Sequence, residues 1–205
     1  MEALMATVNT VRGPVDVDEL GQTLMHEHII LVATEHLDNY GKGAWWDEEF
    51  QVADAVTKLS AVAAKGVRTI VDPTVWGLGR YIPRIQRIAE QVPGLNIVVA
   101  TGIYSFEELP HQYEHRGPGL FIDGPDPMID DFVRDLTDGI ADTGVKAAFL
   151  KCVVEAKGLT PGVERICRAV AQAHTRTGAP ITVHTNSFTQ SGLIALDLFA
   201  KEEWT

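Results

Sequence analysis

Residues 147–152 read Ala-Ala-Phe-Leu-Lys-Cys, an apolar run interrupted by one lysine. The run has the composition of a buried strand, whose side chains alternate between two faces, so Phe149 and Lys151 should lie opposite Leu150 and Cys152. A lysine on the interior face of a buried strand is costly unless it is paired or neutralised. One solution is carboxylation by CO₂, which gives a carbamate able to bridge two metal ions. The other is a strand-end lysine that reaches solvent.

Short apolar runs of this kind alternate with longer stretches of helical period along the whole sequence. The expected strands are Thr23–Leu31, Arg68–Asp72, Asn96–Thr101, Ala147–Val153 and Ile181–His184. The expected helices are Asp47–Lys65, Tyr81–Gln91, Pro127–Ala141, Pro161–Thr177 and a last one from near Gln190 to the end of the sequence. Near-continuously apolar strands that alternate with helices indicate a parallel sheet covered by helices.

Two architectures fit five such β/α units: a doubly wound open sheet, or an eight-stranded (β/α)8 TIM barrel of which about five units are present. Polar side chains follow the carboxyl ends of the expected strands, at His26, His28, Asp72, Tyr104, Lys151 and His184. In a parallel α/β fold this is the face where ligands bind. These polar residues favour the barrel. We therefore predict an α/β fold of TIM-barrel type, with residues 1–205 forming one partial barrel domain.

The same polar residues include types that ligate metals. His26-Glu27-His28 is an H-x-H on an expected strand, so both imidazoles should point to one face, about one coordination sphere apart. His184 shares a face with Thr182 at the end of the fifth expected strand. A lone histidine is more often a core or loop residue than a ligand. Metal-ligand types at three strand ends, Lys151 included, favour a metal site.

The composition limits the classes of protein to consider. Lys and Arg number 17 against 28 Asp and Glu, and the net charge of −11 would repel a phosphate backbone, so nucleic acid is not an expected partner. No run approaches the ~18 apolar residues of a membrane span, and residues 1–20 lack the pattern of a secretory signal, so no membrane partner is expected. Cys152 and Cys167 have no metal spacing and form no disulfide framework. We expect a cytoplasmic protein.

Several other residues have two possible roles. His111 and His115 flank Tyr113 in the long loop after the third expected strand, where they would either line a substrate site or lie on the surface. Arg80 would either hold an anion or lie in solvent at the start of a helix. The Gly77-Leu78-Gly79 segment lacks a GxGxxG directly after a strand, so no dinucleotide is expected.

Six stretches of the sequence, taken in order, resemble the phosphotriesterase family of the amidohydrolase superfamily, and most closely its lactonase-like branch. They are TVRGPVDVDELGQTLMHEHI (10–29), VDPTVWGLGRYIPRI (71–85), VVATGIY (98–104), GVKAAFLKC (144–152), LTPGVERICRAVAQAHTRTGAPITVHT (159–185) and SGLIALDLFA (191–200). The resemblance implies that the metal ligands are His26, His28, Lys151 and His184. It also implies that Tyr104 leans over a bridging hydroxide and contacts the substrate, with Phe106 as a second substrate-binding residue.

The resemblance implies metal-assisted hydrolysis of ester bonds. Two divalent ions, zinc in the first place with cobalt, manganese or iron as alternatives, would be bridged by hydroxide and by carboxylated Lys151. They would lower the pKa of the bridging water and polarise the carbonyl or phosphoryl oxygen, with Lys151 and Tyr104 as the catalytic residues. The substrates would be lactones, acyl-homoserine lactones among them, and promiscuously organophosphate triesters. The full-length family implies a homodimer.

The end of the sequence departs from the family pattern. The family supplies a further His from the sixth strand and an Asp from the eighth, whereas this sequence ends in LFAKEEWT after its fifth β/α unit. We expect the first metal to keep two histidines and the carbamate, and the second to keep the carbamate and His184. The alternatives are a truncated, catalytically dead fragment, and another H-x-H amidohydrolase-type metal hydrolase of the histidinol-phosphatase or deacetylase kind. Lys151 in place of a carboxylate argues against a histidinol phosphatase.

Overall fold

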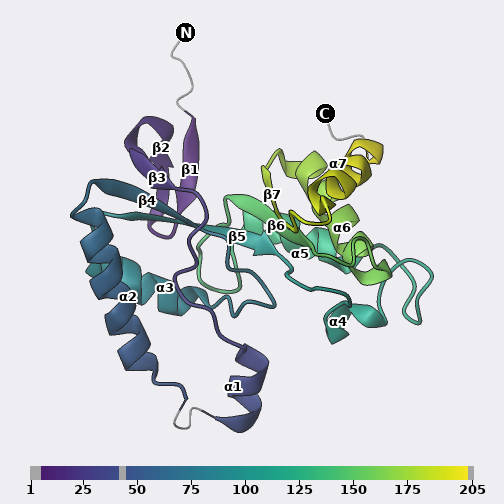
Figure 1. Cartoon of the computed structure of the whole chain (residues 1–205), viewed down its shortest axis with the longest axis horizontal. Helices are drawn as coiled ribbons and strands as arrows, with labels where there is room; N and C mark the ends of the chain where they lie inside the picture. Colours follow the sequence, from purple (N-terminus) through teal and green to yellow (C-terminus); the bar gives the residue numbers. More distant parts are fainter. Residues whose placement is uncertain (1–5, 42–44, 203–205) are drawn as a thin grey trace. The chain divides into compact units, whose positions relative to one another are not determined.

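The computed structural model of the chain describes residues 6–41 and 45–202 (Figure 1). Its strands are β1 (Thr7–Thr10), β2 (Gly13–Asp16), β3 (Gln22–Leu24), β4 (Val67–Asp72), β5 (Asn96–Gly102), β6 (Phe149–Val154) and β7 (Ile181–Thr185). Its α-helices are α1 (Thr34–Tyr40), α2 (Glu48–Ala63), α3 (Ile82–Gln91), α4 (His111–Glu114), α5 (Pro127–Thr137), α6 (Pro161–Thr177) and α7 (Ser191–Lys201), and a short 3-10 helix, η1, spans Val17–Glu19.

Five of the strands form one sheet in the order β3-β4-β5-β6-β7, which is the order of the chain. The β3–β4, β4–β5 and β6–β7 ladders are parallel, whereas β1 and β2 form a separate antiparallel hairpin. Sequential parallel strands are typical of successive β/α units in a TIM barrel, while a doubly wound sheet reverses its order at a switch point. The predicted α/β fold of TIM-barrel type, with five β/α units, is confirmed.

By its internal contacts the chain divides into two compact units. The first comprises Met1–Thr74, Leu78–Ala100 and Gly139–Ala148, and the second comprises Val75–Gly77, Thr101–Asp138 and Phe149–Thr205. Each unit has buried apolar side chains of its own: Ile70 and Ile88 are buried in the first, and Leu150 and Ile166 in the second.

In the first unit, α2 packs on β4 and against α3. The helix α2 begins after Asp47, whose side chain accepts a hydrogen bond from the backbone N–H of Phe50 and so satisfies one of the free donors of the first turn. Three apolar side chains spaced three and four residues apart form the buried face of α2. They are Val52, Ala55 and Leu59.

Arg12 fastens the β1–β2 hairpin to the rest of the first unit. Its guanidinium donates hydrogen bonds to the carbonyls of Ala89 and Leu95, and the neighbouring Val11 N–H donates to the carbonyl of Ile97 in β5. The sequence did not reveal this hairpin. Its partners lie more than 70 positions away, so no local pattern encodes them.

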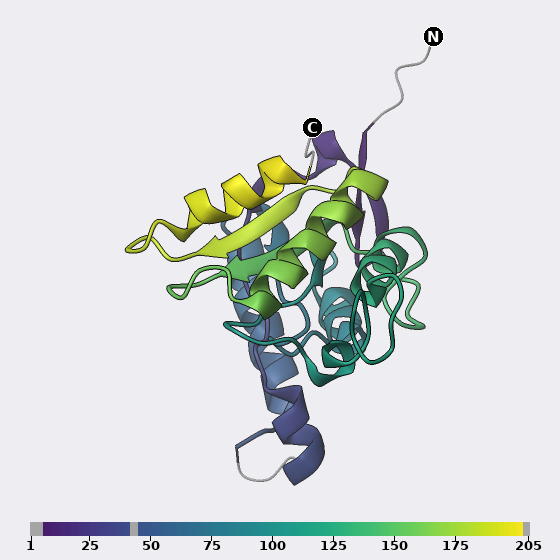
Figure 2. The same cartoon turned by 90° about the vertical axis from the view of Figure 1, so that its right-hand side faces the viewer.

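In the second unit, α6 and α7 both pack along the β6–β7 pair (Figure 2). The helix α6 has the bounds that the sequence predicts. Thr160 caps its start by accepting a hydrogen bond from the Val163 N–H, and Pro161 occupies the first helical position, where a missing N–H costs nothing. Gly178 ends it in the left-handed conformation, φ +73°.

Arg165 of α6 holds the loop that follows β5. Its Nε donates to Asp126, the residue that also caps the start of α5 by accepting from the Met128 N–H. Its two terminal nitrogens donate to the carbonyls of Tyr113 and Arg116. One side chain therefore joins α4, the following loop and the start of α5 to α6.

Several expected boundaries are wrong. The strand expected over Thr23–Leu31 ends at Leu24, after a register shift in the β3–β4 ladder, so the H-x-H follows the strand rather than lying in it. The helix expected to reach Ala141 ends at Thr137, because Gly139 (φ +137°) and Ala141 (φ +49°) have backbone conformations that a helix excludes. The strand β6 begins at Phe149, two residues later than expected. The last expected helix ends at Lys201, and residues 203–205 lie outside the described residues.

Candidate functional site

Lys151 lies in the middle of β6 with its whole side chain enclosed. Its relative exposure is 0%, and among the described residues its Nζ is the one buried side-chain nitrogen or oxygen without a hydrogen-bond partner. This burial lowers the pKa of Lys151 to about 8. The lysine therefore does not reach solvent, and the predicted placement on a buried strand is correct. An enclosed amine without a hydrogen-bond partner is costly to bury, and a carbamate formed from it would be stabilised if metal ions coordinated it.

The backbone of Lys151 is closely approached by Gly102, at the end of β5. A Cβ atom at Gly102 would lie 1.9 Å from the carbonyl oxygen of Lys151, and the glycine has φ +135°. Only glycine combines this backbone conformation with so close an approach. The carboxyl end of β5 thus fixes the position from which the lysine side chain starts.

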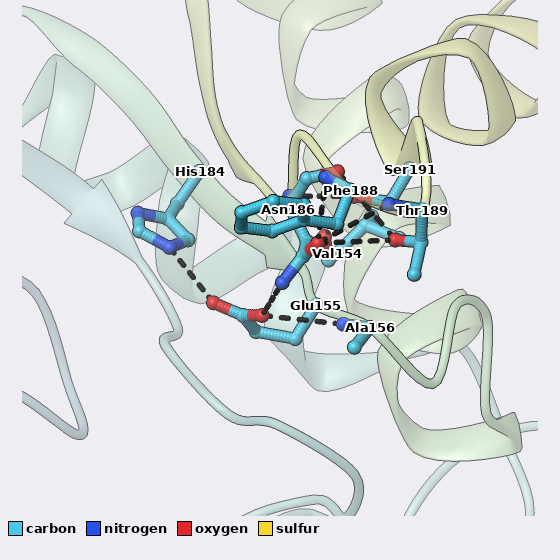
Figure 3. Close-up of polar contacts among 8 residues, drawn as sticks. All are labelled: Val154, Glu155, Ala156, His184, Asn186, Phe188, Thr189 and Ser191. Atoms are coloured by element: carbon cyan, nitrogen blue, oxygen red, sulfur yellow. Dashed lines mark hydrogen bonds and ion pairs between the residues drawn. The ribbon is translucent and has the colours of Figure 1, made fainter.

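His184 lies at the end of β7, which pairs in parallel with β6. In this ladder Lys151 is paired with Thr182, and Val153 with His184, so the two predicted ligands lie on neighbouring strands two positions out of register. The His184 Nε2 lies 2.9 Å from a carboxylate oxygen of Glu155, and the other oxygen of Glu155 accepts from the amide of Asn186 at 3.2 Å (Figure 3). These bonds, that from Asn186 first, hold the pKa of Glu155 below its ordinary value.

Glu155 and Asn186 are site residues that sequence reasoning missed. Each follows a strand that carries a predicted metal ligand, Glu155 after β6 and Asn186 after β7. Their position directly after these strands was the sequence signal that could have identified them. The loop that carries Asn186 is itself fixed, because the buried Ser191 hydroxyl accepts from the Asn186 N–H and donates to the carbonyl of Val154 (Figure 3).

Tyr104, Phe106 and His184 form one aromatic group in the second unit. The Tyr104 ring lies 5.3 Å from that of Phe106 and 5.5 Å from that of His184, both edge to face. The backbone N–H of Tyr104 donates a hydrogen bond to the carbonyl of Trp76. The backbone of Gly77 also approaches closely, since a Cβ atom at Gly77 would lie 2.1 Å from the backbone carbonyl oxygen of Tyr104. Burial raises the pKa of Tyr104, and the charge of Glu155 raises it further, so the phenol keeps its proton at neutral pH.

His26 and His28 lie together in the first unit, although not in a strand. Their ring centroids are 5.3 Å apart and the rings are nearly perpendicular. The Nδ1 of His28 lies 2.8 Å from the Thr74 hydroxyl oxygen, and that hydroxyl donates to Asp72. With the hydroxyl proton committed to Asp72, the network assigns the ring proton of His28 to Nδ1 and the lone pair to Nε2, the tautomer of a metal-binding imidazole.

Asp72 is the buried carboxylate behind His28. It is 2% exposed, and this burial raises its pKa to about 6 although the hydrogen bonds from Thr74 act in the opposite direction. Its Oδ1 also lies 3.8 Å from the His28 Nδ1. A carboxylate behind a histidine is the usual support that orients a metal-binding ring.

The structure therefore brings the predicted site residues together in two sets. His26 and His28 are neighbours in the first unit, while Tyr104, Phe106 and His184 contact one another in the second, near the β6 strand of Lys151. Convergence of the two sets on shared metal ions stays a prediction.

Other residues singled out in the sequence have structural contacts. Arg80 donates to the carbonyl of Ala100, within the first unit. Gly77 and Gly79 each allow a close backbone approach, to the carbonyl oxygens of Tyr104 and Val32 respectively. His111 and His115 lie on the surface, in and directly after α4.

Comparison with known proteins identifies the family. The model of the phosphotriesterase family matches residues 6–203. A phosphotriesterase homology protein of Mycobacterium tuberculosis is 54% identical over 97% of this chain, and an aryldialkylphosphatase of Saccharolobus solfataricus is 35% identical over 89%. A solved structure of the phosphotriesterase from M. tuberculosis superposes with a TM-score of 0.93 at 54% identity and covers 97% of this chain. The chain belongs to the phosphotriesterase family.

The match has a definite extent. The chain spans 60% of the length of the M. tuberculosis protein and of its solved chain, and 55% of the S. solfataricus protein.

In the described part of the chain no helix is both long and apolar enough to cross a membrane.

Proposed function

We propose that this chain carries active-site residues of a divalent-metal-dependent hydrolase that acts on lactones and, promiscuously, on organophosphate triesters. The observation that carries the proposal is the enclosed amine of Lys151, which has no hydrogen-bond partner in the described structure. Membership of the phosphotriesterase family and the 35% identical aryldialkylphosphatase support the hydrolase class. The lactone preference rests on the lactonase-like stretches of the sequence.

The residue types of the predicted ligands suit divalent ions. Carboxylation would turn the Lys151 amine into a bidentate anion, and coordination to the metal ions would offset the cost of burying that charge. Glu155 engages Nε2 of His184, and a carboxylate contact of this kind orients a ligating imidazole and leaves Nδ1 as its ligand atom. His26 and His28 would supply two further imidazoles. When bound, the ions would supply Lewis-acid polarisation of the substrate and a water of lowered pKa.

The remaining site residues would bind and orient the substrate. Tyr104 keeps its proton at neutral pH and can donate a hydrogen bond to a substrate oxygen. Phe106 is 55% exposed beside it and offers an apolar surface to the carbon chain of a lactone or the aryl group of a triester.

Carboxylation and metal content test the proposal. The chain is incubated with ¹³C-bicarbonate and diamagnetic Zn²⁺ and is examined by ¹³C NMR. Elemental analysis measures the metal bound per chain after incubation with bicarbonate and Zn²⁺, Co²⁺ or Mn²⁺. We expect a carbamate signal and bound metal in the wild type, and loss of the signal with a lower metal content in Lys151→Ala.

Lys146→Ala is the matched control, because Lys146 precedes the same strand but is exposed. It should keep both the carbamate signal and the metal. A wild-type chain without a carbamate signal, or with a metal content that Lys151→Ala leaves unchanged, would overturn the assignment of Lys151.

A further inference from the structure

The loop after β5 carries a second group of metal-ligand types that the hydrolase proposal does not use. His111 and Glu114 lie in α4, and His115 directly follows it. One donor atom from each of the three lies within 4.8 Å of the other two. The His111 Nδ1 is 2.9 Å from a Glu114 oxygen, and the two imidazole rings are 5.4 Å apart.

The spacing explains this closeness. Residues three and four apart lie one above the other on a helical turn, so His111, Glu114 and His115 share one face of the turn. Two histidines at this spacing are the arrangement by which helical H-x-x-x-H motifs hold zinc. All three side chains are exposed, so an ion can reach them from solvent.

The backbone beneath the three residues is held in place. Tyr113, between them, is buried and its hydroxyl donates to Asp131. Its N–H donates to the carbonyl of Pro110, while the carbonyl of His115 accepts from the Ile122 N–H. A short turn by itself would not hold three ligands in place. This turn is anchored on both sides, so less conformational entropy of its backbone is lost when an ion binds.

The donor chemistry indicates which ion fits. Imidazole suits zinc, copper and nickel, whereas calcium and magnesium prefer sets of oxygens only. Two nitrogens on one tetrahedral zinc ion lie about 3.4 Å apart, since zinc–nitrogen bonds are ~2.0–2.1 Å long. The donor atoms of the three residues lie within 4.8 Å of one another, and because the side chains are exposed they can rotate to reach that spacing.

We propose that His111, Glu114 and His115 form a surface site for one divalent transition-metal ion of the zinc type. Three protein ligands leave a fourth position of a tetrahedral ion to water. The ion would link the two ends of the turn and stabilise the loop after β5 in its folded form. The site shares no residue with the set proposed for hydrolysis, so either proposal can fail without the other.

Zinc titration of the metal-free chain tests the proposal. Isothermal titration calorimetry should show one equivalent of Zn²⁺ that disappears in both His111→Ala and His115→Ala. Lys151→Ala should keep this equivalent even if it loses others. Substoichiometric paramagnetic Ni²⁺ should broaden the backbone amide NMR signals of residues 111–115 in the wild type and leave them sharp in the two histidine variants.

Gln112→Ala is the control within the same turn, because Gln112 is exposed and is not one of the three donors. It should bind zinc as the wild type does. His115→Gln serves as a second, milder variant if His115→Ala alters the amide spectrum away from the loop. Equal zinc stoichiometry in the wild type and the His111→Ala/His115→Ala double variant, or Ni²⁺ broadening that persists in that variant, would overturn the proposal.

Discussion

Two buried cationic side chains of this molecule have opposite environments. Lys151 has no hydrogen-bond partner in the described structure, whereas Arg84, which is 5% exposed, donates to both oxygens of Glu48 and lies against the rings of Trp46 and Tyr81. A buried ion that is paired and hydrogen-bonded is tolerated as structure. An unpaired one suggests a function, and this contrast is the reason for assigning chemistry to Lys151.

The paired case gives a pH-dependent prediction. Hydrogen bonds from Arg84, first among several causes, lower the pKa of Glu48 below its value in the unfolded chain. The stability that this carboxylate contributes is therefore complete above the unfolded pKa and is lost as the pH falls through the folded pKa. At pH 7, Glu48→Gln should lower the free energy of unfolding by about 1.5–3 kcal/mol, the range for hydrogen bonds to charged groups.

Urea denaturation at a series of pH values measures this effect. The difference between wild type and Glu48→Gln should begin to shrink as the pH falls below the unfolded pKa of about 4.3. It should be smallest below the lowered folded pKa, where the carboxylate is protonated in both states. Glu49→Gln is the control, because Glu49 pairs with Arg87 at the surface and such pairs contribute little. A Glu48→Gln effect that is the same at acidic and neutral pH would contradict the argument.

At the scale of single elements, the approach of β5 to β6 through Gly102 gives a second prediction. A methyl group there would collide with the Lys151 carbonyl, and alanine would also have to adopt φ +135°. Overpacking and backbone strain each cost about 1–3 kcal/mol, so Gly102→Ala should lower the free energy of unfolding by about 2–6 kcal/mol.

Chemical denaturation again provides the measurement. Gly119→Ala is the matched control, because Gly119 has φ +72° but nothing within 4 Å of the position that a methyl group would take, so only the conformational cost of about 1–2 kcal/mol applies. Equal destabilisation by the two substitutions would show that the approach to Lys151 is not tight.

The elements also show how far the fold can be predicted from the sequence. The predicted bounds of α6 are correct to the residue because its Thr-Pro start and Gly end are local signals. The strand predicted at the H-x-H is too long, since apolar residues after Leu24 continue a pattern that the β3–β4 ladder does not follow. The β1–β2 hairpin and α1 are missed, the hairpin because the contacts of Arg12 are distant in sequence.

The candidate site divides in the same way. Side-chain alternation in one strand is enough to predict that Lys151 starts from the interior face, but it leaves open whether the amine reaches solvent. The structure shows the side chain buried. Glu155 and Asn186 could not be assigned a role from the sequence. Their role depends on contacts between the end of β6 and the end of β7, which no pattern within one strand reveals. Sequence reasoning thus finds groups within elements and misses partners between them.

At the scale of the whole molecule, the extent of the family match sets the expectation for activity. The alignment with the M. tuberculosis relative runs over 198 residues, which is 97% of this chain and 60% of the relative. The activity to be measured is that of the 205 residues made as an isolated polypeptide. By the family resemblance, the later strands supply one more histidine and the aspartate that moves protons. We expect kcat/KM for a lactone or a dialkyl aryl phosphate to be at least about 100-fold below that of the complete relative, because loss even of the residues that support a metal's ligands costs about 10–100-fold.

Steady-state kinetics of the two proteins with the same metal ion provides the comparison. Light scattering on the same samples establishes whether a second copy of the chain is associated. Activity close to that of the relative, if abolished by Lys151→Ala, would show that the 205 residues suffice for catalysis.

The way Arg165 holds the loop after β5 has a consequence for how this protein can change over generations. Two of its partners are the carbonyl oxygens of Tyr113 and Arg116, which every amino acid possesses. Side chains in the loop can therefore drift by mutation while the anchor persists. Gly117 is an exception, since any larger residue would meet the Arg165 guanidinium at 2.3 Å. New side chains can therefore arise on the surface of this loop while its backbone stays anchored. His111 in α4 and His115 directly after it are side chains that a lineage could gain or lose in this way.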